Sequence, residues 1–239
     1  MTLEELRKRF IEKYEDTEFQ VNHGSSFILL QDDEIIFTLN KTRNWEQEDE
    51  ITTKIGFGGI GGATESGENA IQCLRREVME EIETNIDDLE FANPKKTYIV
   101  KGPKDVEEID IDTDENCPCP IYIVQLELPL RKDKPSNGKT KSCLLLFVFL
   151  AHINSEAKVR VNADDGIPAL ISVKGDMLET MLQGNEIVSQ NGEEGIKFYW
   201  SKYFGEDKRP KKIHLFPKFT PRGILYSGLN YRTLCEMFE

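Results

Sequence analysis

A run of glycines that leads directly into a short amphipathic helix limits the folds open to this chain more than any other feature of its sequence. A short strand is expected in residues 50–62 to end among five glycines: Gly56, Gly58, Gly59, Gly61 and Gly62. Such density predicts a backbone that turns sharply or approaches another group closely. Beyond it, apolar residues recur every three or four positions, which predicts a helix with one face in the core: Ile71, Leu74, Val78 and Ile82. Ser66 is the expected N-cap, and Glu68 is expected in the first turn, where a carboxylate favours the helix dipole.

Three glutamates crowd the second half of this helix. Glu77, Glu80 and Glu81 are three and four residues apart, which predicts that they share the face nearly opposite the apolar stripe. Like charges at this spacing repel one another and weaken an isolated helix. Because Mg²⁺ takes oxygen ligands, commonly carboxylates with waters and phosphates, a divalent-cation site would explain the cluster. From the glutamates alone, a solvated surface helix is the more ordinary interpretation.

The full spacing around the glutamates resembles the signature of the Nudix hydrolase family, G-x5-E-x7-R-E-U-x-E-E-x-G-U, where U is a bulky aliphatic residue. Gly62, Glu68 and the run from Arg76 to Glu81 match it in register. Seven of the nine fixed positions agree, including every charged one. A chance match at that spacing is improbable, so the resemblance favours a metal site over a solvated helix.

The chain departs from the signature at its end. The final Gly-aliphatic pair is replaced by Glu83 and Thr84. The family glycine resembles a left-handed helix cap, and Asn is the next-best residue for that conformation. We therefore expect the helix end to be displaced, with Asn85 as the cap and Ile86 in place of the aliphatic residue.

The resemblance implies hydrolysis of a nucleoside diphosphate linked to another group, X, with Mg²⁺ or Mn²⁺ as cofactor. Glu77 and Glu81 would be the principal metal ligands, and Glu80 a third ligand or a base acting through a bound water. The other implied roles are a metal-facing carbonyl at Gly62, an arginine that holds Glu77 at Arg76, and support of the loop at Glu68.

Residues outside the signature are open to two interpretations each. Phe57 and Gly61, which lie within the glycine run, are candidate substrate contacts, although Phe57 would serve equally well in the core. Some family members draw a base from another loop, so the acidic run 105–115 offers three further candidates, Glu107, Glu108 and Asp112. A solvated loop is the ordinary interpretation of that run.

The mixture of helical and β patterns predicts an α/β or α+β sandwich. The resemblance implies a Nudix-type α/β/α sandwich with a mixed β-sheet, whose core spans about residues 18–185. We expect helices at 3–15 and 172–184, the latter closed by Gly184, and a hairpin at 25–40 that turns at Gln31–Glu34. Further strands are expected at 96–100, 120–130 and 141–153, the last two joined through turn residues at 135–138. The expected domains are a hydrolase domain at 1–190 and a C-terminal extension at 191–239.

Charge is distributed unevenly along the chain. The net charge is −13, yet residues 197–239 hold nine Lys or Arg against four Asp or Glu. The acidic remainder argues against duplex nucleic acid as a partner. The tail mixes basic and aromatic residues, a pattern suited to RNA, to packing on the core or to a homodimer interface.

The chain has the features of a cytoplasmic protein. It contains no apolar run long enough to span a membrane and no apolar segment near the N-terminus of the kind a secretory signal has. Its five cysteines are scattered, which fits a reducing compartment. A small-molecule nucleotide is the expected substrate. Two alternatives stay open: hydrolysis at RNA 5′ ends, and a non-catalytic Nudix-fold module that binds a nucleotide for regulation.

Overall fold

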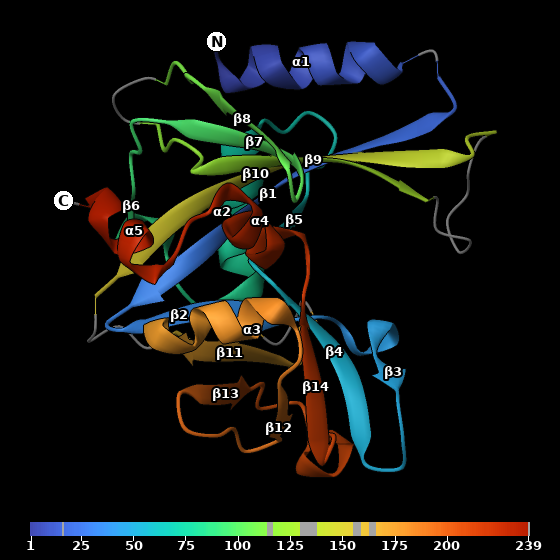
Figure 1. The fold of residues 1–239 in the computed structure, drawn as a ribbon, viewed down its shortest axis with the longest axis vertical. Helices are drawn as coiled ribbons and strands as arrows, with labels where there is room; N and C mark the ends of the chain where they lie inside the picture. The colour runs from blue at the N-terminus through green and yellow to red at the C-terminus, as the bar shows by residue number, and fades with distance from the viewer. Residues whose placement is uncertain (16, 114–116, 130–137, 155–158, 163–165, 239) are drawn as a thin grey trace.

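The computed structural model describes all residues of the 239-residue chain except 16, 114–116, 130–137, 155–158, 163–165 and 239 (Figure 1). The predicted turn at 135–138 therefore lies largely outside the described residues. The helices are α1 (Leu3–Tyr14), α2 (Ala70–Glu81), α3 (Leu178–Gln183), α4 (Phe219–Ser227) and α5 (Tyr231–Cys235). The strands are β1 (Phe19–Gln31), β2 (Glu34–Leu39), β3 (Glu46–Gln47), β4 (Thr52–Gly58), β5 (Ile60–Ala63), β6 (Leu89–Phe91), β7 (Thr97–Gly102), β8 (Asp105–Ile109), β9 (Tyr122–Pro129), β10 (Lys141–Ile153), β11 (Ala169–Lys174), β12 (Ile187–Ser189), β13 (Ile196–Trp200) and β14 (Lys212–Pro217).

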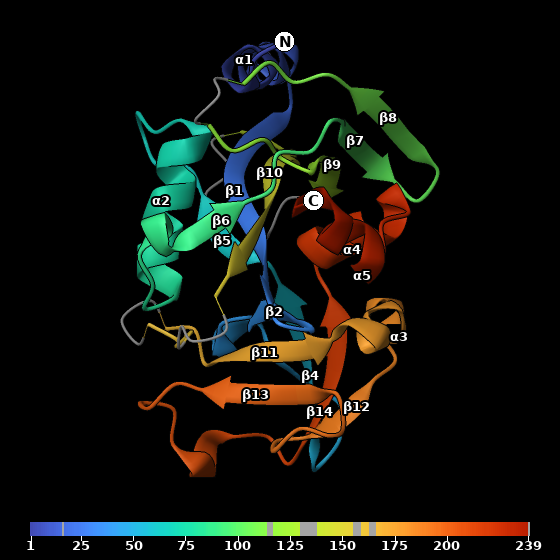
Figure 2. The ribbon, with the colours of Figure 1, turned by 90° about the vertical axis from the view of Figure 1, so that its left-hand side faces the viewer.

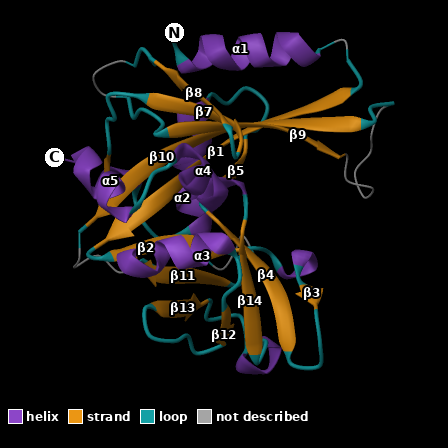
Figure 3. Cartoon of the chain, in the orientation of Figure 1, coloured by secondary structure: helices purple, strands orange, loops and turns teal. Residues whose placement is uncertain are grey.

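Hydrogen bonding joins these strands into one mixed sheet (Figure 3). Its main path runs β12-β14-β4-β2-β1-β10-β9-β7-β8, with β11, β13, β3, β5 and β6 attached beside it. The two longest strands, β1 and β10, pair in parallel from Phe19↔Lys141 to Leu30↔His152. Both are rich in β-branched, aromatic and aliphatic residues, which suit a strand buried on both faces. The predicted α/β fold with a mixed sheet is confirmed.

Helices cover both faces of the central strands. Along β1, Phe27 and Leu29 join the apolar cluster of α1 and α2, whereas Ile28 and Leu30 join the cluster of α3, α4 and α5. This alternation follows from the two-residue period of a strand. Figure 2 shows α2 on one side of the β1–β10 pair, with α4 and α5 on the other. The core therefore consists of two apolar layers, one on each face of the sheet.

The predicted hairpin is confirmed, and its turn residue Asp32 takes the left-handed conformation with φ 53°. The helix predicted for 172–184 begins later than expected. Residues 172–174 continue β11, which pairs with β2 and β13, and α3 starts only at Leu178. Pairing with strands distant in sequence overrides the local helical spacing there. The predicted end is right, since Gly184 caps α3 with φ 73°.

Residues 191–239 contribute strands to the same sheet. β13 pairs with β11, and β14 pairs in parallel with β4. Ile213 and Leu215 of β14 are fully buried, as is Ile224 of α4.

Among the described helices, none is both long and apolar enough to cross a membrane.

Candidate active site

The glycine run forms the floor of the acidic cluster. β5 pairs antiparallel with β1, placing Gly61 opposite Ser26 and Gly62 opposite Ser25. Gly61 has φ 148°, and a Cβ there would lie 2.2 Å from the Ser25 carbonyl oxygen. A Cβ on Gly62 would lie 2.3 Å from Oε1 of Glu77. Glycine at these two positions therefore lets the strand backbone approach both β1 and the carboxylates of α2.

The start of α2 differs from the prediction. Asn69, and not Ser66, is the N-cap, and Glu68 lies before the helix. The Asn69 side chain accepts a hydrogen bond from the Gln72 amide (2.9 Å), and the Gln72 side chain accepts one from the Asn69 amide (2.9 Å). This reciprocal capping box satisfies two backbone donors that Ser66, three residues earlier, would leave unpaired.

The three glutamates of α2 divide between two environments. Glu77 and Glu81 are each only 6% exposed, whereas the Glu80 side chain is 44% exposed. The prediction that all three lie opposite the apolar stripe is wrong for Glu77 and Glu81. At 100° per residue they flank the stripe and face β5, and Glu80 alone points away from it. Oε2 of Glu81 accepts a hydrogen bond from the Gly61 amide at 2.7 Å.

Arg76 connects the carboxylates into one network. Its Nε and Nη2 donate to the two oxygens of Glu68 at 2.9 and 3.2 Å. Its Nη1 donates to Glu77 at 2.7 Å and to Glu80 at 2.9 Å. These bonds, that to Glu68 foremost, raise the pKa of the Arg76 guanidinium. Arg76, and then the Glu65 amide, lower the pKa of the Glu68 carboxyl. The structure thus brings Glu68, Arg76, Glu77 and Glu80 together.

The N-terminal helix also reaches this network, which the sequence did not predict. Nη1 of Arg7 in α1 donates to the backbone carbonyl of Glu68 at 2.8 Å. His23 of β1 lies beside the same guanidinium, with 3.5 Å between Nε2 and Nη2. Burial, and then the Arg7 charge, lower the pKa of His23, which favours the neutral form of the ring beside the arginine. Arg7 therefore ties α1 to the loop that carries Glu68.

The end of α2 differs from the prediction as well. Asn85 does not cap α2, because its φ is −81° and it instead begins the 3-10 turn Ile86–Asp88. The helix ends at Glu81, because the backbone of Ile82 is extended and forms a β-bridge with Val161. The Asn162 amide donates to the Glu81 carbonyl at 3.0 Å, and its side chain donates to the Met79 carbonyl at 2.9 Å. Asn162, which is distant in sequence, thus caps the end of α2. The helix therefore needs no glycine at position 83, where the signature has one.

Two sets of candidates lie away from the acidic cluster. Phe57 is fully buried and packs edge-on against Phe37, at 5.4 Å between ring centres, in the apolar layer opposite α2. β8 carries Glu107 and Glu108 at the edge of the sheet, far from α2 in Figure 2. They pair with Lys101 and Lys96 at 3.1 and 2.6 Å. The structure does not bring these side chains to the cluster; part of the acidic run, 114–116, lies outside the described residues. Asp112 is described, and its amide donates to the Met1 carbonyl.

The residues around Gly62 offer a donor set that suits a hard cation. The side chains supply carboxylate oxygens from successive turns of one helix, and Gly62 supplies a carbonyl that accepts a weak hydrogen bond from the Cys73 thiol at 3.6 Å. Such all-oxygen sets are typical for Mg²⁺ and Mn²⁺. Within the described part of the chain, no three His, Cys, Asp or Glu side chains already converge as a finished chelating group. The donor chemistry fits a divalent cation, and Arg76 occupies oxygens that the cation would share.

Comparisons with known proteins give little beyond this geometry. No protein-family description matches the sequence, and no curated protein matches it either. Among solved structures, the chain is similar to the solution structure of the E. coli ORF135 protein. The two share 13% sequence identity over 68% of this chain and 80% of that one, with a TM-score of 0.35. This likeness is too distant to support a statement about activity.

Proposed function

We propose that this chain hydrolyses a diphosphate linkage in a nucleoside diphosphate joined to another group, with Mg²⁺ or Mn²⁺. The observation that carries the proposal is the Arg76 network. The signature spreads its charged positions over residues 68–81, and the fold gathers three of its carboxylates, Glu68, Glu77 and Glu80, around the Arg76 guanidinium. A solvated charged helix would not bury Glu77 and Glu81 against a glycine strand.

Each residue has a distinct task in this proposal. Glu77 and Glu81 would hold the cation, together with the Gly62 carbonyl. When bound, the cation would neutralise diphosphate charge and lower the pKa of a water molecule. Arg76 orients Glu77, and Glu68 fixes Arg76 through two parallel hydrogen bonds. The half-exposed Glu80 can reach solvent, so it is positioned to accept a proton from an attacking water.

The test compares two Glu→Gln variants that differ only in position. Glu81→Gln keeps an oxygen for the Gly61 amide but loses the charge, whereas Glu83→Gln changes an exposed neighbour beyond the helix. Both would be incubated with Mg²⁺ or Mn²⁺ and ADP-ribose, NADH, nucleotide sugars, dinucleoside polyphosphates, nucleoside triphosphates or 5′-triphosphorylated RNA. We expect Glu81→Gln to lose at least about a hundredfold in kcat, typical for a lost charged contact at a reacting centre. Glu83→Gln should retain full activity.

One observation favours a second function, that of a module which binds a nucleotide without cleaving it. Arg76 already bonds to Glu77 and Glu80, so it engages carboxylate oxygens that a catalytic cation would share. If the wild-type chain binds a nucleotide but cleaves none of the panel, this second function replaces hydrolysis. If RNA alone is cleaved, the substrate is an RNA 5′ end.

A further inference from the structure

A second candidate site lies at the other end of the glycine run. A cavity of about 520 Å³ opens between the segment that follows β2 and the junction of β14 with α4. Its lining combines amides, aromatic rings and two cations: Asn40, Arg43, Asn44, Trp45, Lys218 and Phe219. Glu46 is the acidic residue of the lining. Amides and aromatic rings beside positive charge are suited to a planar, anionic ligand.

Trp45 is the fixed element of this cavity. Its Nε1 donates to the Asn40 carbonyl at 2.7 Å, and its ring meets Phe204 edge-on at 5.6 Å between ring centres. The same side chain lines a neighbouring cavity of about 400 Å³, whose lining includes the basic residues Lys208, Arg209 and Lys211. The indole is therefore anchored in one orientation while it borders two hollows of the surface. A held aromatic ring next to open space is a platform on which a base can stack.

Three polar side chains at the cavity have no hydrogen-bond or ion-pair partner within the described residues. They are the amides of Asn40 and Asn44 and the guanidinium of Arg43. An amide offers a donor and an acceptor side by side, which matches the edge of a nucleobase. A guanidinium offers positive charge and a flat face. The polar groups around Trp45 are thus chemically complementary to a nucleotide.

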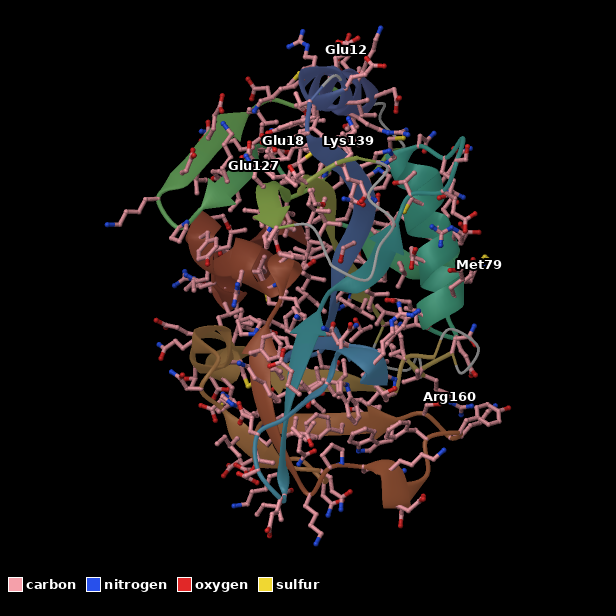
Figure 4. All side chains as sticks on the ribbon, turned by 90° about the vertical axis from the view of Figure 1, so that its right-hand side faces the viewer. Glu12, Glu18, Met79, Glu127, Lys139 and Arg160 are labelled. Carbon is pink, nitrogen blue, oxygen red and sulfur yellow. The ribbon has the colours of Figure 1, made fainter. Side chains whose placement is uncertain are left out.

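The chain itself connects this cavity to the acidic cluster. The Lys218 amide donates to the Phe57 carbonyl at 2.9 Å, so the cavity wall is bonded to β4. β4 continues through Gly59 into β5, and the ribbon reaches the flank of α2 (Figure 4). From Phe57 to Gly62 the chain takes five steps, at most about 17 Å between the two Cα atoms at strand spacing. The cavity and the acidic cluster therefore border the same stretch of backbone, from the end of β4 to β5.

We propose that the base of a nucleotide stacks on Trp45, its edge bonds to Asn40 and Asn44, and its phosphates extend past Lys218 toward Gly62 and Glu77. Arg43 adds positive charge at the open side of the cavity. The direction of the phosphates rests on the hydrolase function proposed above. The stacking of the base does not, because binding is measured separately from cleavage.

The experiment measures binding to the full chain by calorimetry in the presence of a chelator. The probes are ADP, GDP, CDP and UDP, with inorganic pyrophosphate as a ligand that has no base. The variants are Trp45→Leu and Arg43→Ala. Arg232→Ala is the matched control, because Arg232 has an 88% exposed side chain and lines a different cavity, near α5.

We expect the tightest-binding nucleoside diphosphate to lose at least about tenfold in affinity with Trp45→Leu, the scale of a lost base–aromatic stack. Arg43→Ala, at an exposed position that cannot disturb the core, should also weaken binding severalfold. Arg232→Ala should bind as the wild type does, and Trp45→Leu should leave pyrophosphate binding unchanged.

The outcomes separate the two proposals. If both cavity variants bind nucleotides like the wild type, or if the wild type binds none of the four, the inference is overturned. Glu81→Gln can still abolish hydrolysis in that case, and the proposed function then stands. If the cavity variants lose binding while no substrate is ever cleaved, the base site stands and the hydrolase fails.

Discussion

Arg76 shows why a single residue type is needed at the centre of the acidic cluster. Its planar fork presents Nε and Nη2 to both oxygens of Glu68, and the remaining nitrogen reaches Glu77 and Glu80. A lysine carries one nitrogen and could not span three carboxylates in fixed directions. The guanidinium therefore sets the geometry of α2 and of the preceding loop at the same time.

The lowered pKa of Glu68 leads to a prediction about acid stability. A carboxyl whose pKa is lower in the folded state stabilises the fold above its unfolded pKa, near 4.5, and loses that contribution as the pH falls through the folded value. We expect Glu68→Gln to be less stable than the wild type at pH 7. The difference should shrink steadily as the pH is lowered below 4.5. Urea unfolding at pH 7, 5, 4 and 3 measures both chains.

The control for this prediction is Glu65→Gln, which changes an exposed carboxylate of the same loop. Its stability difference from the wild type should be small and nearly independent of pH. A Glu68→Gln difference that stayed constant down to pH 3 would contradict the assignment of the effect to the Arg76 ion pair.

Among the elements, the sequence was most informative where local spacing decides the structure. The apolar stripe predicted α2, and alternation with a polar turn predicted the β1–β2 hairpin. The cap of α2 was also within reach, because Asn69 and Gln72 have the spacing of a capping box. Ser66 is also a residue type that caps helices, but the residue three positions later is Asn69, which is not the Glu or Gln of a capping box.

The contacts that complete the site join segments far apart in the chain, and no local spacing signals them. Arg7 bonds to the Glu68 carbonyl across 61 positions, and Asn162 caps α2 from the far side of β10. Both arginine and asparagine are common on surfaces, so neither is distinctive in sequence. Met79, which Figure 4 shows projecting from α2, stands at the position that the signature leaves unrestricted and is 67% exposed.

The bond from Arg7 makes α1 part of the site, which can be tested within that helix. Arg7→Met should lower the free energy of unfolding by about 1–2 kcal/mol, because the Glu68 carbonyl loses a charged donor. Arg9→Met, on the exposed face of α1, should stay within about 0.5 kcal/mol of the wild type. Urea unfolding at pH 7 gives both values. Equal effects of the two substitutions would show that the bond contributes no stability.

For the whole molecule, the last fifty residues are built into the sheet. Their buried side chains come from two strands and two helices: Ile196, Ile213, Leu215, Ile224 and Leu234. Each contributes about 1.5–3 kcal/mol on burial. Residues 191–239, which were expected to form an extension, thus contribute burial that residues 1–190 alone would lack.

A truncation tests whether residues 1–190 form a domain alone. Without β14, the paired edge of β4 is exposed, and β11 loses β13. We expect the fragment 1–190 to aggregate or to lack a cooperative thermal transition by circular dichroism, while the full chain unfolds cooperatively. A soluble fragment with a sharp transition would place a domain boundary near residue 190 after all.

The parallel pairing of β1 with β10 determines when this protein can acquire its structure during synthesis. Phe19 must meet Lys141, so the middle of the sheet cannot assemble until β10 has left the ribosome. At about 5–20 residues per second, the apolar edge of β1 waits many seconds without its partner. Closing so long a loop also slows folding, because its entropy is lost before any contact compensates for it. During that interval the edge of β1 that will pair with β10 is open to pairing with other chains.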